Sequence, residues 1–337
     1  MNASVFVIGG TGQIGVATAR RFQAAGWDVT VGCRTGGDEE LTASGVRVVA
    51  LDRADTSRLL AFARGRDAVV DTVAYTPDHG EQLAALAGEV GSLVVISTGA
   101  VYRGAEDGGD PLPVPVSEDW PVLEPGTEGY GAGKAAMERV LLATTGLPVS
   151  ILRPGTLHGP RSASLHQWSF IKPALDRRPH VVLAYDGRSR FSTSATANVA
   201  ELIYRCAVKP GTRVLNAADD EALTVAEIGQ RIFAAMSHEC AIVTFPGPPR
   251  DDGLGFNPWG VPADIVLDTG RARSELGYTP AVSYEKALEA DIEWAVRATA
   301  GKSWHDVFPG LIGRYGPAPW FRYEAEDAYV STIRGHE

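Results

Sequence analysis

The chain has 337 residues, which is enough for two domains or one large one. Hydrophobic residues make up 45% and charged residues 21%, ordinary values for a globular protein that argue against intrinsic disorder. The formal net charge of −10 argues against a protein whose main partner is nucleic acid or an anionic membrane surface. No apolar run approaches the ~18–20 residues of a membrane span.

The N-terminus and the cysteines bear on location. Residues 1–8 lack the positive region and the long apolar stretch of a signal peptide. The three cysteines are an odd number without a C-x-x-C motif, so neither a disulfide scaffold nor a zinc ribbon is expected. We therefore expect a reduced, cytoplasmic protein without a metal site.

Residues 1–155 alternate short β-branched runs with helix-like segments. The runs are apolar on both faces, as parallel strands are when helices cover both sides of a sheet. The expected strands are Ser4–Ile8, Asp28–Cys33, Val46–Leu51, Ala68–Val73, Leu93–Ser97 and Val149–Arg153. A helix over Gln13–Ala25 follows the first strand, and Gly26 stands where a C-cap glycine belongs. This order predicts a doubly wound α/β sheet.

The segment Arg103–Gly129 interrupts this alternation with five prolines, seven acidic residues and one basic residue. It is either a solvated linker or a loop that covers a site. Farther along, we expect helices over Thr224–Ala235, with a capping box of Thr224 and Glu227, and over Tyr284–Ala298. Residues 303–337 hold seven aromatic side chains, so we expect an ordered, packed tail rather than a disordered one.

The motif Gly9-Gly10-Thr11-Gly12-Gln13-Ile14-Gly15 follows the first expected strand and opens the first expected helix. Three of its glycines have separate tasks. Gly9 suits a tight turn, Gly12 lets the backbone approach a pyrophosphate, and Gly15 permits close packing of helix on strand. The helix N-terminus adds N–H groups and a partial positive charge. The motif therefore predicts a dinucleotide site, with a purely structural turn as the alternative.

Tyr130 and Lys134 are four residues apart, so a helix that begins here places both on one face. An ammonium close to a phenol favours the phenolate and lowers its pKa, which suits Tyr130 to donate and accept a proton near neutral pH. The alternative is a surface helix with an unrelated lysine.

A third motif, Ser97 to Tyr102, follows a strand at the edge where α/β sheets bind ligands. A hydroxyl there could orient a substrate carbonyl, or could simply cap a helix.

These motifs resemble those of the short-chain dehydrogenase/reductase superfamily, in its extended, epimerase/dehydratase-like branch, over the chain to about residue 300. The segments Leu51–Asp55, Leu152–Pro160 and Asp268–Pro280 also resemble motifs of that branch, in the same order. The resemblance implies a Rossmann-type doubly wound parallel sheet with a smaller C-terminal substrate domain. We expect a dinucleotide-binding domain over 1–160 to which the chain returns around 192–207, a mainly substrate-binding domain over 161–300, and an aromatic tail over 301–337.

The resemblance also implies roles for single residues. The implied catalytic residues are Thr98, Tyr130 and Lys134. The implied cofactor contacts are Gly9, Thr11, Gly12, Gln13, Ile14, Arg34, Asp52, Arg53, Val73, Ala74, Tyr130, Lys134, Pro154 and Thr156. Candidate substrate contacts are Tyr75, His79, Tyr102, His158, Arg161, Trp168 and Arg190.

The sequence departs from the pattern of that branch at three places. His158 stands where a tyrosine is more usual, and the stretch before Val199-Ala200 lacks the usual acidic residues. Asp71–Pro77 lacks the histidine common in sugar-nucleotide epimerases, and is closer to an atypical subgroup that includes chloroplast RNA-associated proteins. These departures argue against a sugar-nucleotide substrate.

Three functions compete. The first is an NAD(P)-dependent oxidoreductase that transfers a hydride between a nicotinamide and a hydroxyl or carbonyl carbon of a small molecule, with Tyr130 as general acid/base. The second is an NDP-sugar-type epimerase or dehydratase that recycles its cofactor. The third is a non-catalytic dinucleotide-binding or RNA-associated protein, which an intact set of Thr98, Tyr130 and Lys134 argues against. The sequence leaves the oligomeric state open, and a homodimer is one possibility.

We expect NADP rather than NAD as the cofactor. The second expected strand ends in Cys33-Arg34, and Arg34 lies nineteen residues beyond Gly15, where NAD-preferring sites usually place an acidic residue. The guanidinium of Arg34 offers a planar set of donors suited to a 2′-phosphate. The alternative is that Arg34 only stacks on the adenine, which would serve either cofactor.

Overall fold

The computed structural model describes residues 2–105 and 111–334. Across these residues the chain forms two compact units. The first unit comprises Met1–Gly155, Ser194–Asp219 and Leu267–Val282, and the second comprises Thr156–Thr193, Asp220–Val266 and Ser283–Glu337. The sequence analysis assigned 267–282 to the substrate domain, whereas the structure includes this segment in the first unit. The reason is long-range pairing, because Asp268 donates its N–H to the carbonyl of Val116 and accepts the side-chain amide of Asn216 on its own carbonyl.

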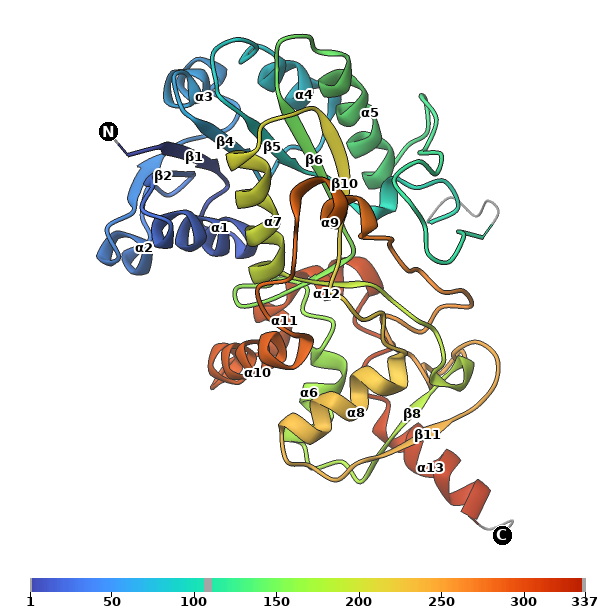
Figure 1. Ribbon diagram of the computed structural model, residues 1–337. Helices are drawn as coiled ribbons and strands as arrows, with labels where there is room; N and C mark the ends of the chain where they lie inside the picture. Colours follow the sequence, from blue (N-terminus) through green and yellow to red (C-terminus); the bar gives the residue numbers. More distant parts are fainter. Residues whose placement is uncertain (1, 106–110, 335–337) are drawn as a thin grey trace. The chain divides into compact units, whose positions relative to one another are not determined.

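Within the described residues, seven parallel strands form the central sheet of the first unit, in the order β10-β6-β5-β4-β1-β2-β3 (Figure 1). They are β1 (Ser4–Ile8), β2 (Asp28–Cys33), β3 (Arg47–Ala50), β4 (Ala68–Asp71), β5 (Leu93–Ile96), β6 (Val149–Pro154) and β10 (Arg213–Ala217). The order reverses at β1, which has β2 on one side and β4 on the other. The predicted doubly wound α/β fold is therefore confirmed, and each expected strand is present with ends that differ by no more than two residues.

Helices cover both faces of this sheet (Figure 1). On one face α1 (Gln13–Ala24) packs against α7 (Thr196–Val208), and on the other α4 (Pro77–Ala84) packs against α5 (Tyr130–Ala143). The remaining helices of this unit are α2 (Glu39–Ala43), α3 (Thr56–Ala63), the 3-10 turn η1 (Gly99–Val101) and α9 (Gly270–Leu276). Fully buried apolar side chains from α3, α4 and α5 pack on alternate strand residues and form one continuous core, as two-layer packing requires. This core fixes where the strand ends lie.

The second unit is built mainly from helices around an aromatic-rich core. Its elements are β7 (Thr156–His158), α6 (Trp168–Leu175), β8 (His180–Leu183), the 3-10 turn η2 (Tyr185–Gly187), α8 (Val225–Ala235), β11 (Ala241–Thr244), α10 (Tyr284–Thr299), α11 (Trp304–Val307), α12 (Pro309–Tyr315) and α13 (Tyr323–Arg334). β9 (Thr193–Ala195) spans the junction back to the first unit. The predicted capping box at Thr224 and Glu227 is confirmed at the start of α8, and α10 ends one residue beyond its expected end. Within residues 2–105 and 111–334, every helix falls short of the length and apolar character needed to span a bilayer.

The described part of Arg103–Gly129 packs against the first unit. Val116 is buried and pairs with Leu267, and the N–H of Leu123 donates to the carbonyl of Val101. Residues 116–123 are therefore attached to the first unit, whereas residues 124–129 are exposed. Residues 106–110 of the same segment lie outside the described residues.

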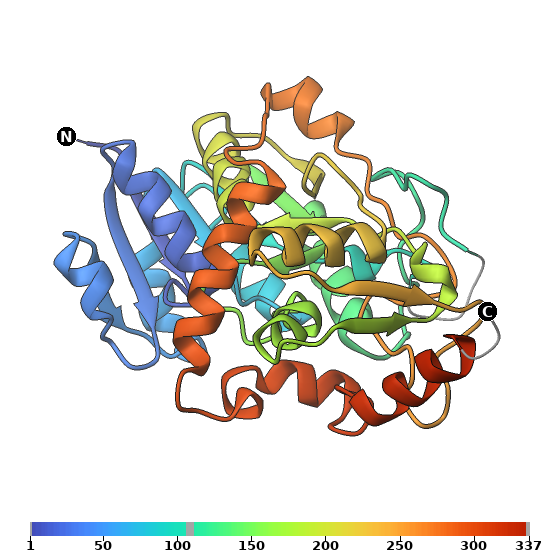
Figure 2. The same ribbon diagram turned by 90° about the horizontal axis from the view of Figure 1, so that it is seen from below.

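The described part of the aromatic tail, residues 301–334, is packed, as predicted (Figure 2). Phe308 is fully buried against Trp168, with ring centroids 5.1 Å apart, and Trp320 is buried against the rings of Trp304 and Phe256. Helix α13 lies along β8. The tail is therefore part of the core of the second unit rather than an appendage to it.

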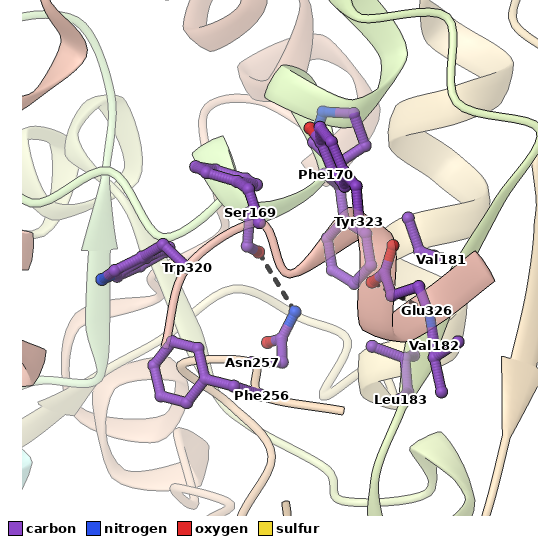
Figure 3. A pocket seen from close by; sticks show the side chains of 12 residues that line it. Ser169, Phe170, Val181, Val182, Leu183, Phe256, Asn257, Trp320, Tyr323 and Glu326 are labelled. Atoms are coloured by element: carbon purple, nitrogen blue, oxygen red, sulfur yellow. Dashed lines mark hydrogen bonds between the residues drawn. The ribbon is translucent and has the colours of Figure 1, made fainter. Parts of the chain in front are cut away.

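A small cavity of about 30 Å³ lies where α13 meets β8 (Figure 3). The carboxyl of Glu326 borders it, and its Oε1 accepts the N–H of Val182 at 3.3 Å. Its Oε2 is 3.9 Å from a guanidinium nitrogen of Arg178, and that guanidinium also pairs with Asp327. Burial raises the pKa of Glu326 to about 7. The carboxyl of Glu326 is thus one of several contacts that join α13 to β8 and to Arg178.

Truncation after Gly301 should give a protein that aggregates or is inactive. Removing residues 302–337 would expose the buried rings that Phe308 and Trp320 now cover, a larger apolar patch than soluble proteins usually tolerate. Size-exclusion chromatography and thermal unfolding of the truncated chain check this. A monodisperse variant with unchanged Tm and activity would show that the tail is dispensable.

Glu326→Gln should stabilise the protein at pH 8 and have little effect at pH 5. The folded-state pKa of about 7 lies above the ordinary carboxyl value of 4.5, so the stability contributed by the protonated carboxyl is present below pH 4.5 and is lost as pH rises from there through 7. The neutral amide keeps that contribution, and we expect a gain of roughly 1–3 kcal/mol at pH 8. Urea unfolding at both pH values measures it. Glu324→Gln, an exposed change on the same helix, is the control, and an equal effect in both variants would contradict the prediction.

Candidate active site

The predicted site residues of the first unit gather at one edge of the central sheet. Parallel strands have their carboxyl ends at the same edge, and β1, β4, β5 and β6 are neighbours there. The residues that follow these strands are Gly9, Thr72, Ser97 and Gly155. The strand order reverses between β1 and β4, and such a reversal opens a crevice in which α/β proteins bind ligands.

The glycine motif forms a cradle that side chains would fill. Gly9 has a φ of +77°, and a Cβ there would lie 2.5 Å from Oγ1 of Thr72. A Cβ on Gly15 would overlap the carbonyl oxygen of Gly9, so the third glycine permits the close packing of α1 on β1. Gly12 is the N-cap of α1, with no side-chain cap and no acidic residue in the first turn. The first N–H groups of α1 can therefore face a bound anion, and the loop fits the pyrophosphate of a dinucleotide.

Lys134 and Tyr130 occupy the first turn of α5, as predicted, but in different surroundings. Lys134 is 1% exposed, and its Nζ donates to the carbonyl of Ile96 at 2.7 Å. Burial lowers the pKa of Lys134 to about 8, although the carboxylate of Asp71 opposes this shift. Tyr130 is 52% exposed, and its ring centroid lies 5.9 Å from Nζ of Lys134. A buried cation thus stands beside an accessible phenol, an arrangement that suits proton transfer.

Two neighbouring hydroxyls follow β5. Ser97 is buried, and within the described residues its Oγ has no hydrogen-bond partner. Thr98 is partly exposed and caps η1, where its Oγ1 accepts the N–H of Ala100 at 3.2 Å. The hydroxyl proton of Thr98 is not used in that bond. Thr98 is therefore the more accessible hydroxyl of the two, and its catalytic role stays a prediction.

A buried ion pair lies beneath the same edge, and sequence reasoning did not anticipate it. Arg53 contacts the carboxylate of Asp71 at 2.8 Å, and Asp71 is fully buried and also accepts the N–H of Val73 at 2.8 Å. Gln82 accepts a second guanidinium N–H of Arg53 at 3.1 Å. The pair joins β3, β4 and α4, so the guanidinium of Arg53 has a structural task alongside any cofactor contact. Asp52, next to it, is exposed and accepts the N–H of Ala54.

Other residues predicted for the first unit differ in exposure. Arg34 is exposed just after β2, and among residues 2–105 and 111–334 no carboxylate pairs with it.

Tyr102 is fully buried, and its hydroxyl donates to Asn216 at 2.6 Å. Burial raises the pKa of Tyr102 to about 12, and the guanidinium of Arg153 lies 4.8 Å from its ring centroid. Tyr102 thus packs inside the unit, and its predicted substrate contact stays a prediction. The remaining predicted contacts Val73, Ala74 and Pro154 line the carboxyl ends of β4 and β6.

Two of the five predicted residues in the second unit, His158 and Trp168, are buried in its interior. His158 is fully buried, with Nδ1 2.7 Å from Oδ2 of Asp291, and Trp168 is in the aromatic core. Arg190 is exposed and donates to the carbonyl of Ala222 at 3.2 Å. The two others, Thr156 and Arg161, are partly exposed. Tyr130, Lys134, Thr98, Tyr75 and His79 therefore belong to the first unit with the glycine motif. Five predicted residues belong to the second unit, namely Thr156, His158, Arg161, Trp168 and Arg190.

Comparisons with known proteins found a matching family model and several similar proteins. Residues 5–218 match the model of the NAD dependent epimerase/dehydratase family. A protein of Oryza sativa subsp. japonica named "Putative GDP-L-fucose synthase 2" is 25% identical over 328 residues, which are 90% of this chain and 90% of that one. The Escherichia coli protein YbjS is 27% identical over 195 residues, which are 49% of this chain and 56% of that protein.

Solved structures with a similar fold include two enzymes. UDP-N-acetylglucosamine 4-epimerase from Bacillus cereus has a TM-score of 0.70 at 17% identity, covering 88% of this chain and 100% of that one. dTDP-glucose 4,6-dehydratase from Bacillus anthracis, in complex with NAD, has a TM-score of 0.68 at 17% identity, covering 89% and 98%. At these identities the likeness establishes a Rossmann-type fold.

Proposed function

The chain belongs to the NAD dependent epimerase/dehydratase family, and we propose that within it Tyr130 is the general acid/base for hydride transfer at a hydroxyl or carbonyl carbon of a small molecule. The family resemblance inferred from the motifs is confirmed, and the chain is an enzyme of oxidoreductase type that uses a nicotinamide dinucleotide. The observation that carries the proposal is the pairing of buried Lys134 with exposed Tyr130 at the carboxyl edge of the sheet.

The residues of this edge divide the work. When bound, the nicotinamide supplies the hydride acceptor or donor, while the glycine motif and the first turn of α1 would hold its pyrophosphate. The ammonium of Lys134 stabilises the phenolate of Tyr130 and would bond the nicotinamide ribose. Tyr130 then takes a proton from a substrate hydroxyl, or returns one to a carbonyl oxygen. Thr98 donates a hydrogen bond to the same oxygen and holds it within reach of the phenol.

The alternative is an epimerase or dehydratase that keeps and recycles its cofactor. The family name and the titles of the similar structures favour it. The stretch Asp71–Pro77, which lacks the histidine common in sugar-nucleotide epimerases, favours a different substrate. UDP-glucose, UDP-N-acetylglucosamine and dTDP-glucose make a suitable panel. Conversion without a net change in absorbance at 340 nm identifies recycling, whereas a stoichiometric change identifies an oxidoreductase. The expectations of a cytoplasmic location, of a homodimer and of no nucleic-acid partner stay predictions.

NADP is the cofactor that we propose in preference to NAD. Arg34 is exposed directly after β2 and has no carboxylate partner among the described residues. A guanidinium in that position can form charge-assisted hydrogen bonds to a 2′-phosphate. The exposed carboxylate of Asp52 lies after β3, and in the resembling family its counterpart faces the adenine, so it does not decide between the two.

Tyr130→Phe should nearly abolish turnover and leave cofactor affinity within a few fold of wild type. The phenol acts mainly in the transition state, and proton transfer usually contributes ~10²–10⁴-fold to kcat. Lys134→Ala should lower both kcat and cofactor affinity, because the ammonium has both tasks. Steady-state kinetics on a converted substrate, with fluorescence titration of NADH and NADPH, measure these effects. A Tyr130→Phe variant that keeps more than about a tenth of wild-type kcat would refute the assignment.

Arg34→Ala should weaken NADPH binding about ten- to a hundredfold and change NADH binding little. A charge-assisted hydrogen bond contributes roughly 1.5–3 kcal/mol, and only NADPH carries the 2′-phosphate that would accept it. Titration of NADH and NADPH into the wild-type protein and the variant gives the four dissociation constants. Equal wild-type affinities, or equal losses for both cofactors in the variant, would contradict the preference for NADP.

A further inference from the structure

We propose that Tyr75 is a positioning residue for Lys134, and that the face of its ring, rather than its hydroxyl, holds the ammonium beside Tyr130. The inference rests on the proposed role of Lys134 and extends it to a residue outside the helix. Tyr75 was a candidate substrate contact from the sequence, so the two interpretations of its ring have to be separated by experiment.

The ammonium of Lys134 contacts Tyr75 more closely than it contacts Tyr130. Its Nζ lies 4.3 Å from the ring centroid of Tyr75 and 5.9 Å from that of Tyr130. The two rings are 6.2 Å apart and inclined at 49°. A distance of 4.3 Å from the centroid is well inside the range of a cation–π interaction, which is stronger where the cation is desolvated, as Lys134 is.

The backbone of Tyr75 is fixed from both sides. Its N–H donates to Nδ1 of His79 at 2.9 Å, and the hydroxyl of Thr76 caps α4. On the other side, α5 passes so close that a Cβ on Gly133 would lie 2.8 Å from the carbonyl oxygen of Tyr75. Gly133 lies between Tyr130 and Lys134 in the sequence. The ring of Tyr75 is therefore held against the same helical turn that carries the proposed catalytic pair.

The charged groups around Lys134 act in opposite directions on its ammonium, so a neutral group can add to its stabilisation. Asp71 is the first carboxylate to favour its charged form, but Asp71 is already paired with Arg53, whose own charge acts in the opposite direction. Glu138 also favours the ammonium, and the lowered pKa of His79 reflects Lys134 among its smaller causes. The face of an aromatic ring stabilises an ammonium without accepting its proton.

Tyr75 does not compete with Tyr130 as the proton carrier. Burial raises the pKa of Tyr75, and the neighbouring carboxylate of Asp71 raises it further. Its phenol therefore stays protonated where Tyr130 is proposed to work. With 44% of the residue exposed, its hydroxyl can still face solvent or substrate, which is the competing interpretation.

The test measures NADPH affinity of the full-length protein by fluorescence between pH 7 and 10, which requires no substrate. Lys134 is proposed to bond the ribose, so affinity should fall as the ammonium loses its proton, with a midpoint near its pKa of about 8. Tyr75→Phe keeps the ring and should leave this midpoint unchanged. Tyr75→Leu removes the ring, keeps the site apolar, and should lower the midpoint by about half to one pH unit. Tyr75→Trp, with the strongest π-face, should raise it.

The controls separate this proposal from the one it rests on. Lys134→Ala should remove the midpoint, and if it does not, the proposed role of Lys134 fails and the role of Tyr75 fails with it. If Lys134→Ala removes the midpoint but Tyr75→Leu and Tyr75→Trp leave it in place, only the role of Tyr75 is overturned. A shift in Tyr75→Phe as large as that in Tyr75→Leu assigns the effect to the hydroxyl and also overturns it. Should Tyr75→Leu fail to fold, Tyr75→Trp and Tyr75→Phe still decide the outcome.

Discussion

The burial of one ammonium group constrains the arrangement of the whole sheet edge. Lys134 is almost completely removed from solvent, yet its Nζ is held by a backbone carbonyl at the end of β5 and by the face of an aromatic ring after β4. A buried charge is costly unless it is paired or hydrogen-bonded, so α5, β4 and β5 have to keep their relative positions. Because Tyr130 begins the same helix, fixing Lys134 also fixes the phenol.

Further buried charged residues lie near Lys134, and they limit which substitutions this part of the fold tolerates. Glu138, one turn farther along α5, pairs with Arg153 on β6 at 2.5 Å, and Asp71 on β4 pairs with Arg53. Removing one partner of such a pair leaves an uncompensated charge, which usually destabilises a protein strongly. Asp71 and Glu138 favour the charged form of Lys134 while Arg53 disfavours it, so the lysine pKa depends on the network as a whole.

Local patterns made much of this predictable, and long-range contacts account for the rest. Three features are each contained in a short segment of the chain: the glycine motif, the pair of Tyr130 and Lys134, and each apolar run. Because such segments can be read locally, the sequence indicates the strand ends and the start of α5. The pairing of Arg53 with Asp71 depends on how the chain between β3 and β4 folds back, and no local pattern reports it. For the same reason Tyr102, which follows a strand as a ligand contact would, proves to be buried against Asn216.

The sequence between the two catalytic candidates shows how the site and the helix are built together. Glycine in a helix interior is less favourable than alanine by about 1 kcal/mol, yet α5 has glycine at 131 and 133, in its first turn. A Cβ on Gly131 would overlap the carbonyl of Ala100, and one on Gly133 would press on that of Tyr75. The two glycines therefore let the first turn of α5 lie against the chain that follows β5 and the chain that follows β4 at once. Helix stability is lowered locally so that the start of α5, which carries Tyr130 and Lys134, can pack against both segments.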